Sequence, residues 1–284
     1  MSERHPPNGP LWTLYEHVAM LIGLGSLAAL CLAWLPFAML LHPLLPRTVG
    51  QRLGRRVIMG GFHFYLRLLS GLCSCRFDLS ELDTLRDQGP LIIAANHPSL
   101  LDAVLIVSRL PNVVCVMKAA LMRHPLFGSA ARLARYIRND GMLQIVQQSR
   151  ETLQTGAQVL IFPEGTRTKA FPLDPLTPTL GLIARRSGAP VQTVFLEFST
   201  PYLGKAWPLF RPPVLPLTVK ARLGRRFDAP TDHMAFTTEL HPGVCARPSP
   251  ASDGFVLNHC MLRVKDPAVS LDFYTRVFGM RVLR

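Results

Sequence analysis

The chain has 284 residues, of which 49% are hydrophobic and 17% are charged, and its formal net charge at pH 7 is +13. This length can bury a sizeable core, and the positive charge favours anionic partners such as an acidic membrane surface, a phosphorylated substrate or nucleic acid. The sequence argues against nucleic acid, because it has no zinc-finger spacing, no basic helix and no aromatic-flanked glycine motif.

Cysteine usage indicates the redox compartment. The sequence has six cysteines, none of them in a C-x-x-C pair. Such spacing argues against both a disulfide framework and a zinc site. We therefore predict reduced, mostly buried thiols and a domain that faces the cytosol.

The first predicted element is a membrane helix. Residues 18–41 (VAMLIGLGSLAALCLAWLPFAMLL) contain no charged side chain, and as a helix they would be about 36 Å long, enough to cross a hydrocarbon core of roughly 30 Å. A signal peptide fits less well, because the run is too long, only Arg4 precedes it as a side-chain cation and no A-x-A site follows. Pro36 is expected to kink the helix, and a re-entrant or interface-lying hairpin is the alternative. We predict a membrane anchor over residues 1–47.

The residues after this run indicate its orientation. Four arginines follow it closely: Arg47, Arg52, Arg55 and Arg56. The positive-inside rule therefore places the rest of the chain in the cytoplasm. The segment VIMGGFHFYLRLLSGL (57–72) predicts a second helix within residues 48–74. This helix either lies on the bilayer, with the arginine cluster near lipid phosphates, or is a buried core helix.

Residues 75–240 alternate between strand-like and helix-like segments. Strands are expected at 75–80, 90–96, 112–118, 158–163 and 189–198, and helices at 100–109, 124–135, 142–154 and 176–187. Apolar strands such as LIIAA and VLIFP are typical of a sheet that is covered on both faces. The expected fold class is therefore α/β, a sheet with flanking helices preceded by the membrane helix.

The segment NHPSLLD (96–102) follows one of these strands, at the end where α/β sheets bind ligands. One interpretation is structural: Ser99 has the position of an N-cap, with Asp102 three residues later as in a capping box. The other is functional: Asp102 hydrogen-bonds His97, fixes its tautomer and stabilises the imidazolium, so that His97 can deprotonate a hydroxyl. The spacing alone does not decide between them.

A second motif, FPEGTR (162–167), follows another expected strand. Gly165 permits close backbone approach, and Arg167 can make a forked contact to a phosphate. A lone EGTR is also compatible with a surface turn that holds an ion pair. After NHPSLLD, on a basic α/β domain next to a membrane helix, the motif becomes specific.

Together the two motifs resemble the lysophospholipid acyltransferase family, over roughly residues 50–225. The resemblance implies that His97 deprotonates the hydroxyl of an acceptor, which then attacks an acyl thioester carried by coenzyme A or by acyl carrier protein. It implies that Asp102 orients His97 and stabilises its charge. It implies no metal and no prosthetic group.

The same resemblance implies acceptor binding at five positions: Arg138, in RYIRND, and Glu164, Gly165, Thr166 and Arg167. Two departures bear on the acceptor. The segment FPLDPLTPTLG (171–181) replaces the family's Phe-Lys-x-Gly run, and Thr193 stands where a second proline is common. Glycerophosphate lipids, other lysolipids and specialised hydroxylated acceptors therefore all stay open.

The composition changes near residue 241. Residues 241–253 have the Pro, Ser and Gly content of a linker. Residues 254–284 resemble the N-terminal segment of glyoxalase I (lactoylglutathione lyase), which implies a metal-ligating role for the position of His259. A single histidine cannot hold a catalytic metal, so we expect no glyoxalase activity. A gene fusion or truncated reading frame is the preferred interpretation, and a small partner-binding extension is the alternative.

These features predict an enzyme of the inner cell membrane whose catalytic domain faces the cytoplasm. Its expected partners are the bilayer, a lysophospholipid such as 1-acylglycerol 3-phosphate, and acyl-CoA or acyl carrier protein. A non-catalytic lipid-binding protein of the same fold is disfavoured because His97, Asp102, Glu164 and Arg167 are all present. A metal-dependent lyase is disfavoured by its missing ligands, and a nucleic-acid binder ranks last.

Overall fold

The computed structural model describes residues 9–168, 176–233 and 236. The expected linker at 241–253 and the glyoxalase-like segment at 254–284 lie outside these residues. So do residues 171–175 of the segment 171–181.

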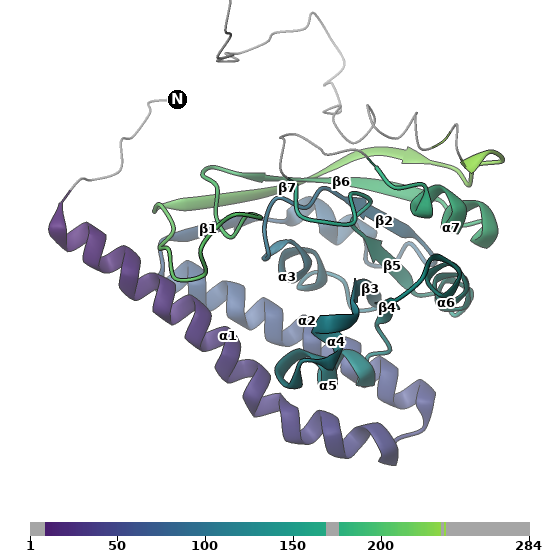
Figure 1. The fold of residues 1–284 in the computed structure, drawn as a ribbon, viewed down its shortest axis with the longest axis horizontal. Coiled ribbons are helices and arrows are strands. Elements are labelled where there is room, and N and C mark those ends of the chain that lie inside the picture. The colour runs from purple at the N-terminus through teal and green to yellow at the C-terminus, as the bar shows by residue number, and fades with distance from the viewer. Residues whose placement is uncertain (1–8, 169–175, 234–235, 237–284) are drawn as a thin grey trace, which may run out of the picture. The chain divides into compact units, whose positions relative to one another are not determined.

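In the described part of the chain, seven strands form one mixed sheet with helices on both faces (Figure 1). The strands are β1 (Cys75–Asp78), β2 (Ile92–Ala95), β3 (Val113–Lys118), β4 (Ile137–Asn139), β5 (Gln158–Ile161), β6 (Val191–Phe198) and β7 (Leu217–Phe227). Their order across the sheet is β1-β7-β6-β2-β5-β3-β4. The expected α/β class is confirmed, and the five expected strands are all present.

The sequence analysis missed two strands, β4 and β7. Strand β4 has only three residues, too few to show a pattern. Strand β7 has eleven, and its buried positions alternate with polar ones because one of its faces packs on the core. It pairs antiparallel with β6 and parallel with β1. As β6 is parallel to β2, strand β1 runs opposite to β2.

Eight helical segments accompany the sheet in the described residues. They are α1 (Pro10–Leu44), α2 (Arg47–Leu72), the 3-10 helix η1 (Ser80–Leu85), α3 (Asp102–Val107), α4 (Ala119–Arg123), α5 (Pro125–Leu133), α6 (Met142–Gln154) and α7 (Thr179–Ser187). Helix α6 has the bounds that the sequence predicts. Helices α1 and α2 are longer than expected, since they begin eight and ten residues earlier, at Pro10 and Arg47.

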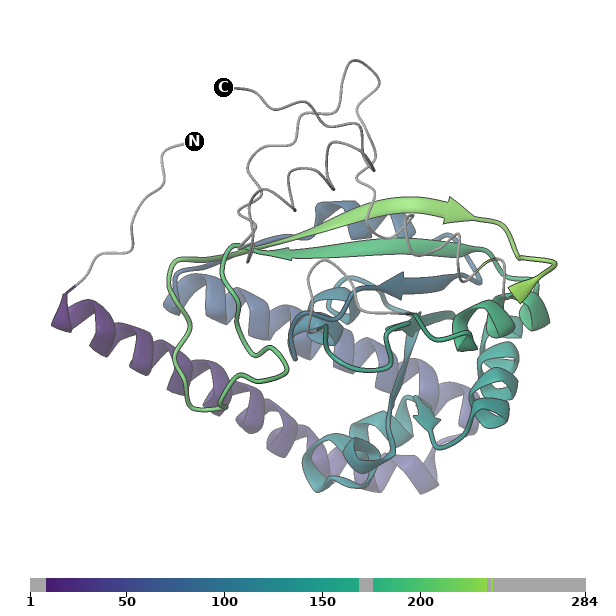
Figure 2. The same ribbon diagram turned by 45° about the horizontal axis from the view of Figure 1, so that its top comes forward.

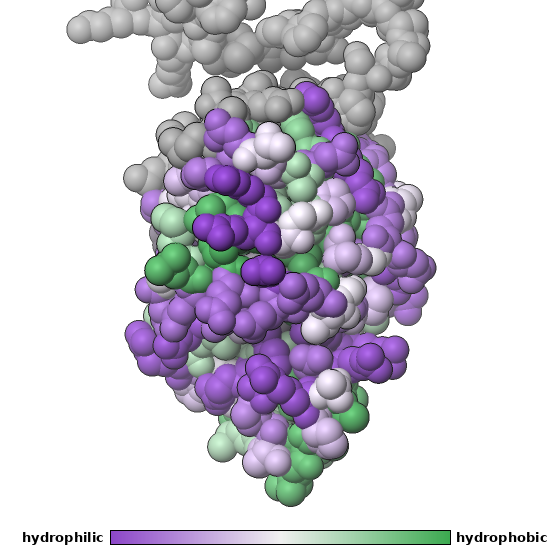
Figure 3. All heavy atoms as spheres, turned by 90° about the vertical axis from the view of Figure 1, so that its right-hand side faces the viewer, coloured by the Kyte–Doolittle hydropathy of each residue, from purple (hydrophilic) through white to green (hydrophobic). Residues whose placement is uncertain are grey.

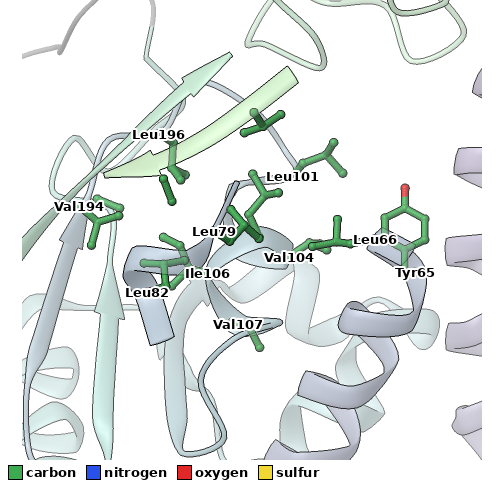
Figure 4. Close-up of a cluster of buried hydrophobic side chains, with 14 of the residues drawn as sticks. Tyr65, Leu66, Leu79, Leu82, Leu101, Val104, Ile106, Val107, Val194 and Leu196 are labelled. Carbon is green, nitrogen blue, oxygen red and sulfur yellow. The ribbon is translucent and has the colours of Figure 1, made fainter. Parts of the chain in front are cut away.

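Two hydrophobic clusters pack on the two faces of the sheet. Alternate residues of β2 show the division: Ile93 and Ala95 face the cluster that contains α2 and α3, whereas Ile92 and Ala94 face the cluster that contains α6 and α7. Figure 2 shows the helices on both sides of the strands. Figure 4 shows ten labelled members of the first cluster: Tyr65, Leu66, Leu79, Leu82, Leu101, Val104, Ile106, Val107, Val194 and Leu196. The sheet is therefore the middle layer of three.

Helix α1 is, within the described ranges, the only helix long and apolar enough to cross a membrane. Only 17% of its most apolar window is buried by the rest of the chain, unlike a core helix. Its first turns nevertheless dock on the domain: the Tyr15 hydroxyl donates to the carbonyl of Leu72 at 2.9 Å, and Glu16 Oε1 accepts from the amide of Leu215 at 2.9 Å. The anchor expected at 1–47 thus packs on the domain that follows.

Helix α2 docks through glycines and one buried arginine. The side chain of Arg55 is only 4% exposed; its Nε donates to the carbonyl of Ala134 at 3.2 Å, and its Nη1 donates to Asn112 Oδ1 at 2.7 Å. Burial lowers the pKa of this guanidinium. The expectation that Arg55 belongs to a lipid-facing arginine cluster is therefore wrong, whereas Arg52 and Arg56 are exposed.

Close packing at Gly54 generates the first prediction. A Cβ at this position would lie 2.8 Å from the backbone nitrogen of Ala134, whereas a Cβ at Gly60 on the same helix would meet nothing within 4 Å. We expect Gly54→Ala to lower the midpoint of thermal unfolding, because backbone atoms cannot yield as a flexible side chain can. Gly60→Ala is the control, and alanine should favour this helix by ~1 kcal/mol over glycine. Equal midpoints for the two variants, measured in detergent, would contradict this packing.

Candidate active site

The site begins where β2 ends, at Asn96. The side chain of Asn96 is fully buried; its Nδ2 donates to the carbonyl of Leu196 at 3.1 Å, and its Oδ1 accepts from the amide of Leu196 at 2.8 Å. The side-chain amide of Asn96 thus replaces the two backbone hydrogen bonds by which a further residue of β2 would pair with β6. Pro98, two residues on, has no amide proton with which to continue a strand. The exit point of the chain from the sheet is therefore fixed, and His97 stands at it.

The structure brings His97 and Asp102 together. His97 Nδ1 lies 2.7 Å from Asp102 Oδ2, the imidazole side chain is 20% exposed and the carboxylate is fully buried. The same Oδ2 accepts from the amide of Ser99 at 2.8 Å. One oxygen of Asp102 therefore accepts from the backbone before α3 and also contacts the imidazole, whereas the expected N-cap at Ser99 is wrong. Helix α3 begins at Asp102, with Leu101 rather than Ser99 at the N-cap.

The protonation states follow from this geometry. Complete burial raises the pKa of Asp102 to about 6, although the hydrogen bonds from His97 and Ser99 act in the opposite direction. Above that pH the carboxylate is ionised and can only accept, so Nδ1 of His97 carries the proton. The lone pair then resides on Nε2, which is the tautomer that a general base requires.

An aromatic ring restrains the imidazole on its face. The ring of Phe162, the first residue of FPEGTR, stacks on His97 with centroids 4.1 Å apart and an interplanar angle of 19°. Its position follows from β5, which pairs in parallel with β2 and ends at Ile161. The second motif therefore helps to hold the catalytic candidate of the first.

Glu164 joins the two motifs through the backbone. This side chain is only 6% exposed, and its Oε1 accepts from the amide of His97 at 3.0 Å and from the hydroxyl of Thr168 at 2.7 Å. The amide of Thr168 in turn donates to the carbonyl of His97 at 2.8 Å. In this structure Glu164 fixes the turn that carries His97, a role that the sequence analysis did not assign to it.

The remaining residues of the second motif shape its turn. Gly165 has a φ of +67°, which favours glycine, and its amide donates to the carbonyl of Phe162 at 3.0 Å. Thr166 is partly exposed beside it. Nη1 of Arg167 donates to the carbonyls of Leu203 and Gly204, at 3.0 and 2.7 Å. The forked phosphate contact expected of Arg167 would therefore have to use its other nitrogens.

Arg138 lies apart from this cluster. It belongs to β4, its side chain is 51% exposed, and it forms an ion pair with Asp140. Strands β2, β5, β3 and β4 are neighbours in that order and run parallel, so Arg138 shares the sheet edge of His97 at roughly 14 Å, three strand spacings away. The structure thus places it on the same edge but not in contact with the His–Asp pair.

Three residues of this site were missed by the sequence analysis: Asn96, Phe162 and Thr168. A polar residue that ends an apolar strand was a usable signal for Asn96, whereas nothing local marks Phe162 or Thr168. Within the part of the chain that the structure describes, no group of three or more His, Cys, Asp or Glu side chains could hold a metal ion.

Comparison with known families agrees with this geometry. Residues 76–197, which contain both motifs and nearly all of β1 to β6, match the family model described as Acyltransferase. Residues 256–284 match a second model, the Glyoxalase/Bleomycin resistance protein/Dioxygenase superfamily.

Named relatives of the acyltransferase domain occur in bacteria and in plants. A 1-acyl-sn-glycerol-3-phosphate acyltransferase from Pseudomonas aeruginosa is 24% identical over 221 residues, which are 76% of this chain and 82% of that protein. An enzyme of the same name from Helicobacter pylori is 32% identical over 107 residues, which are 34% of this chain and 45% of that protein.

One solved structure resembles the fold. The 1-acyl-sn-glycerophosphate acyltransferase PlsC from Thermotoga maritima superposes with a TM-score of 0.60 over 81% of this chain and 94% of that chain, at 18% identity. This likeness concerns the fold. The C-terminal segment is 59% identical over 51 residues to a lactoylglutathione lyase from Pseudomonas aeruginosa, of which this chain spans only 29%.

The raised pKa of Asp102 generates the second prediction. Burial in the folded state favours the protonated carboxyl of Asp102. The protonated group therefore stabilises the fold fully below pH 3.8, its ordinary pKa, and this stabilisation is lost as the pH rises through about 6. The pKa shift from 3.8 to about 6 corresponds to a loss of roughly 3 kcal/mol in the free energy of unfolding, at ~1.36 kcal/mol per pH unit. Asparagine does not titrate, so the unfolding midpoint of Asp102→Asn should rise relative to the unmutated protein between pH 4 and pH 7.

The measurement is thermal unfolding in detergent over that pH range, with the exposed Asp87→Asn as control. If the difference in unfolding midpoint between Asp102→Asn and the unmutated protein does not vary with pH, the buried charge of Asp102 does not destabilise the fold.

Proposed function

We propose that this protein is a membrane-anchored O-acyltransferase that moves a fatty acyl group from an acyl thioester to the hydroxyl of a lysophospholipid, such as 1-acylglycerol 3-phosphate. The observation that carries the proposal is the 2.7 Å contact between His97 and the buried Asp102, at the end of β2 and beside the FPEGTR turn. The acyltransferase family match and the names of the relatives support the same reaction class.

The reaction follows from the tautomer of His97. Nε2 removes the proton from the acceptor hydroxyl while its oxygen attacks the thioester carbonyl carbon, and Asp102 stabilises the imidazolium that forms. The tetrahedral intermediate collapses, the carbon–sulfur bond breaks and an ester remains. The imidazolium returns the proton to the thiolate leaving group, so His97 ends as it began. No metal or prosthetic group takes part, and the carrier of the thioester is either coenzyme A or acyl carrier protein.

The residues around the pair divide into positioning and binding roles. Glu164 and Phe162 hold His97 from two sides, through its amide and its ring face. Gly165 and Thr166 lie at the exposed part of the turn, where an acceptor can approach the backbone. We assign the acceptor phosphate to Arg167, whose Nη1 already fixes the loop at Leu203 and Gly204. Arg138, on the same sheet edge, is the second candidate for that charge.

A membrane location fits the acceptor and donor. Helix α1 exposes a series of large apolar side chains that water would not favour: Leu11, Leu14, Val18, Leu21, Leu32, Phe37, Met39, Leu40 and Leu44. Figure 3 shows a face of the molecule that is mostly hydrophilic, with apolar side chains at the lower tip, where α1 and α2 meet, and in a second patch higher on the same face. We propose that α1 lies in the inner membrane and that the positive charge after it keeps the domain on the cytoplasmic side.

The third prediction tests the base. We expect His97→Ala to lower acyl transfer to 1-acylglycerol 3-phosphate by roughly 10²–10⁴-fold, the range typical of general-base loss. His124→Ala is the control, because His124 is an exposed histidine at the start of α5. Transfer is measured with labelled acyl-CoA and with acyl carrier protein thioester in the same membranes. Near-normal turnover by His97→Ala would exclude the mechanism, and no transfer by the unmutated protein would favour the non-catalytic lipid-binding alternative.

A second activity is suggested by the C-terminal match. The segment 256–284 resembles lactoylglutathione lyase relatives, but one histidine, His259, cannot hold a catalytic metal. The fourth prediction is that a chain ending at Pro248 inserts in membranes and transfers acyl groups at the rate of the full chain, and that the full chain shows no metal-stimulated conversion of the methylglyoxal–glutathione adduct. Loss of transfer by an inserted, protease-resistant truncated chain would make the segment part of the working enzyme.

A further inference from the structure

A second polar site lies away from the His–Asp pair. It is an open cleft of about 310 Å³ between α2, the end of β1 and the residues after α3. Ten residues line it: His63, Leu66, Arg67, Ser70, Phe77, Asp78, Leu79, Ser80, Ser108 and Arg109. Its volume is at the small end of the roughly 300–1,000 Å³ typical of small-molecule sites.

The topology separates this cleft from the proposed active site. Because β1 runs opposite to β2, the carboxyl end of β1 lies at the sheet edge away from His97. Helix α3 connects the two places: it begins at Asp102, and Ser108 and Arg109 follow its last turn. A ligand of the cleft would therefore sit at the far end of α3 from the reacting groups.

One face of α2 supplies the donors of the cleft. His63, Arg67 and Ser70 follow one another at helical spacing, so their side chains share a face, with Leu66 between them. Figure 4 shows Leu66 and Leu79, two apolar lining residues, in the hydrophobic cluster that supports the cleft. The cleft thus has an apolar floor and a row of hydrogen-bond donors along one wall.

The charges of the cleft do not cancel. Nε and Nη2 of Arg109 donate to the two carboxylate oxygens of Asp83, and Asp78 Oδ2 accepts from Arg222 at 2.9 Å. The two carboxylates nearest the cleft are therefore each engaged by an arginine. Among the described residues, the side chains of His63, Arg67 and Ser70 form no hydrogen bond or ion pair. This wall of the cleft therefore keeps unused donors and a net positive charge.

The lowered pKa of His63 reflects the same excess of positive charge. Burial lowers the pKa of His63, and the nearby guanidiniums of Arg67, Arg109 and Arg86 lower it further, with Asp83 acting in the opposite direction. Three cations around one imidazole constitute an environment that an anion would stabilise.

We infer that this cleft binds a phosphate group, with Arg67 as its cationic donor, the imidazole N–H of His63 as a second donor and Ser70 as its hydroxyl donor. Guanidinium and phosphate are a matched pair, since a fork of N–H groups meets two oxygens. The surroundings favour the headgroup of an anionic phospholipid over free phosphate. Phe64 and Leu72 on the same helix are exposed apolar side chains, and α1 docks on the end of that helix through the contact between Tyr15 and Leu72.

The test uses thermal unfolding of the purified full chain in neutral detergent. One arm adds phosphatidylglycerol to the micelles, a second adds inorganic phosphate, and phosphatidylcholine and sodium chloride serve as controls. We expect a saturable rise of the unfolding midpoint with a phosphate-bearing ligand. Arg67→Gln should raise the half-saturating concentration by roughly ten- to a hundredfold, as expected for the loss of a charged hydrogen-bond donor.

Arg56→Gln is the matched control, because Arg56 is exposed on the same helix but does not line the cleft. A response to phosphatidylglycerol alone identifies a lipid headgroup, and a response to inorganic phosphate as well identifies a soluble phosphate site. Acyl transfer in neutral lipid should be unchanged in Arg67→Gln, which separates this site from the proposed function. No saturable response, or an equal loss in Arg56→Gln, would overturn the inference.

Discussion

The register between β2 and β5 is the constraint on which the site depends. Ile92 pairs with Val159 and Ala94 with Ile161, an offset of 67 residues in both cases. Continued beyond the ends of the strands, the same offset places His97 opposite Glu164, and the amide of His97 indeed donates to Glu164 Oε1 at 3.0 Å. A slip of one residue would reverse the faces of one strand and separate the motifs. The two motifs are therefore parts of one structure, since each ends a strand of the same parallel pair.

The arrangement of the two motifs has a cost in stability, because it buries the carboxylate of Asp102. A fully buried carboxylate is unfavourable, which its raised pKa expresses, and the hydrogen bonds from His97 and Ser99 offset only part of the cost. A residue selected for stability alone would be neutral at this position. The same oxygen that begins α3 also orients the imidazole, so the chain tolerates a destabilised group where it needs a negative charge beside a histidine.

Sequence patterns predicted the local parts of the structure well and the tertiary parts poorly. Apolar runs identified β2 and β5 because strands that are covered on both faces leave a compositional signal. Strand β7 carries charged residues on one face, although the alternation of Leu217, Val219 and Ala221 with polar residues was a readable signal. The link from Glu164 to the His97 amide had no local signal, because it depends on which strands become neighbours. Sequence proximity suggested a role for Asp102, whereas the roles of Asn96 and Phe162 needed the sheet order.

The arginines show most clearly why composition alone cannot assign function. A net charge of +13 suggests a uniformly basic surface, yet Arg55 is buried against the carbonyl of Ala134, and Arg167 donates to the carbonyls of a neighbouring loop. Arg109 and Arg222 are engaged by carboxylates. A guanidinium that donates to backbone carbonyls has a structural role, and only its remaining N–H groups can bind a ligand. Arg67 is fully available to a ligand, because Asp78 and Asp83, the carboxylates nearest its cleft, are engaged by other arginines.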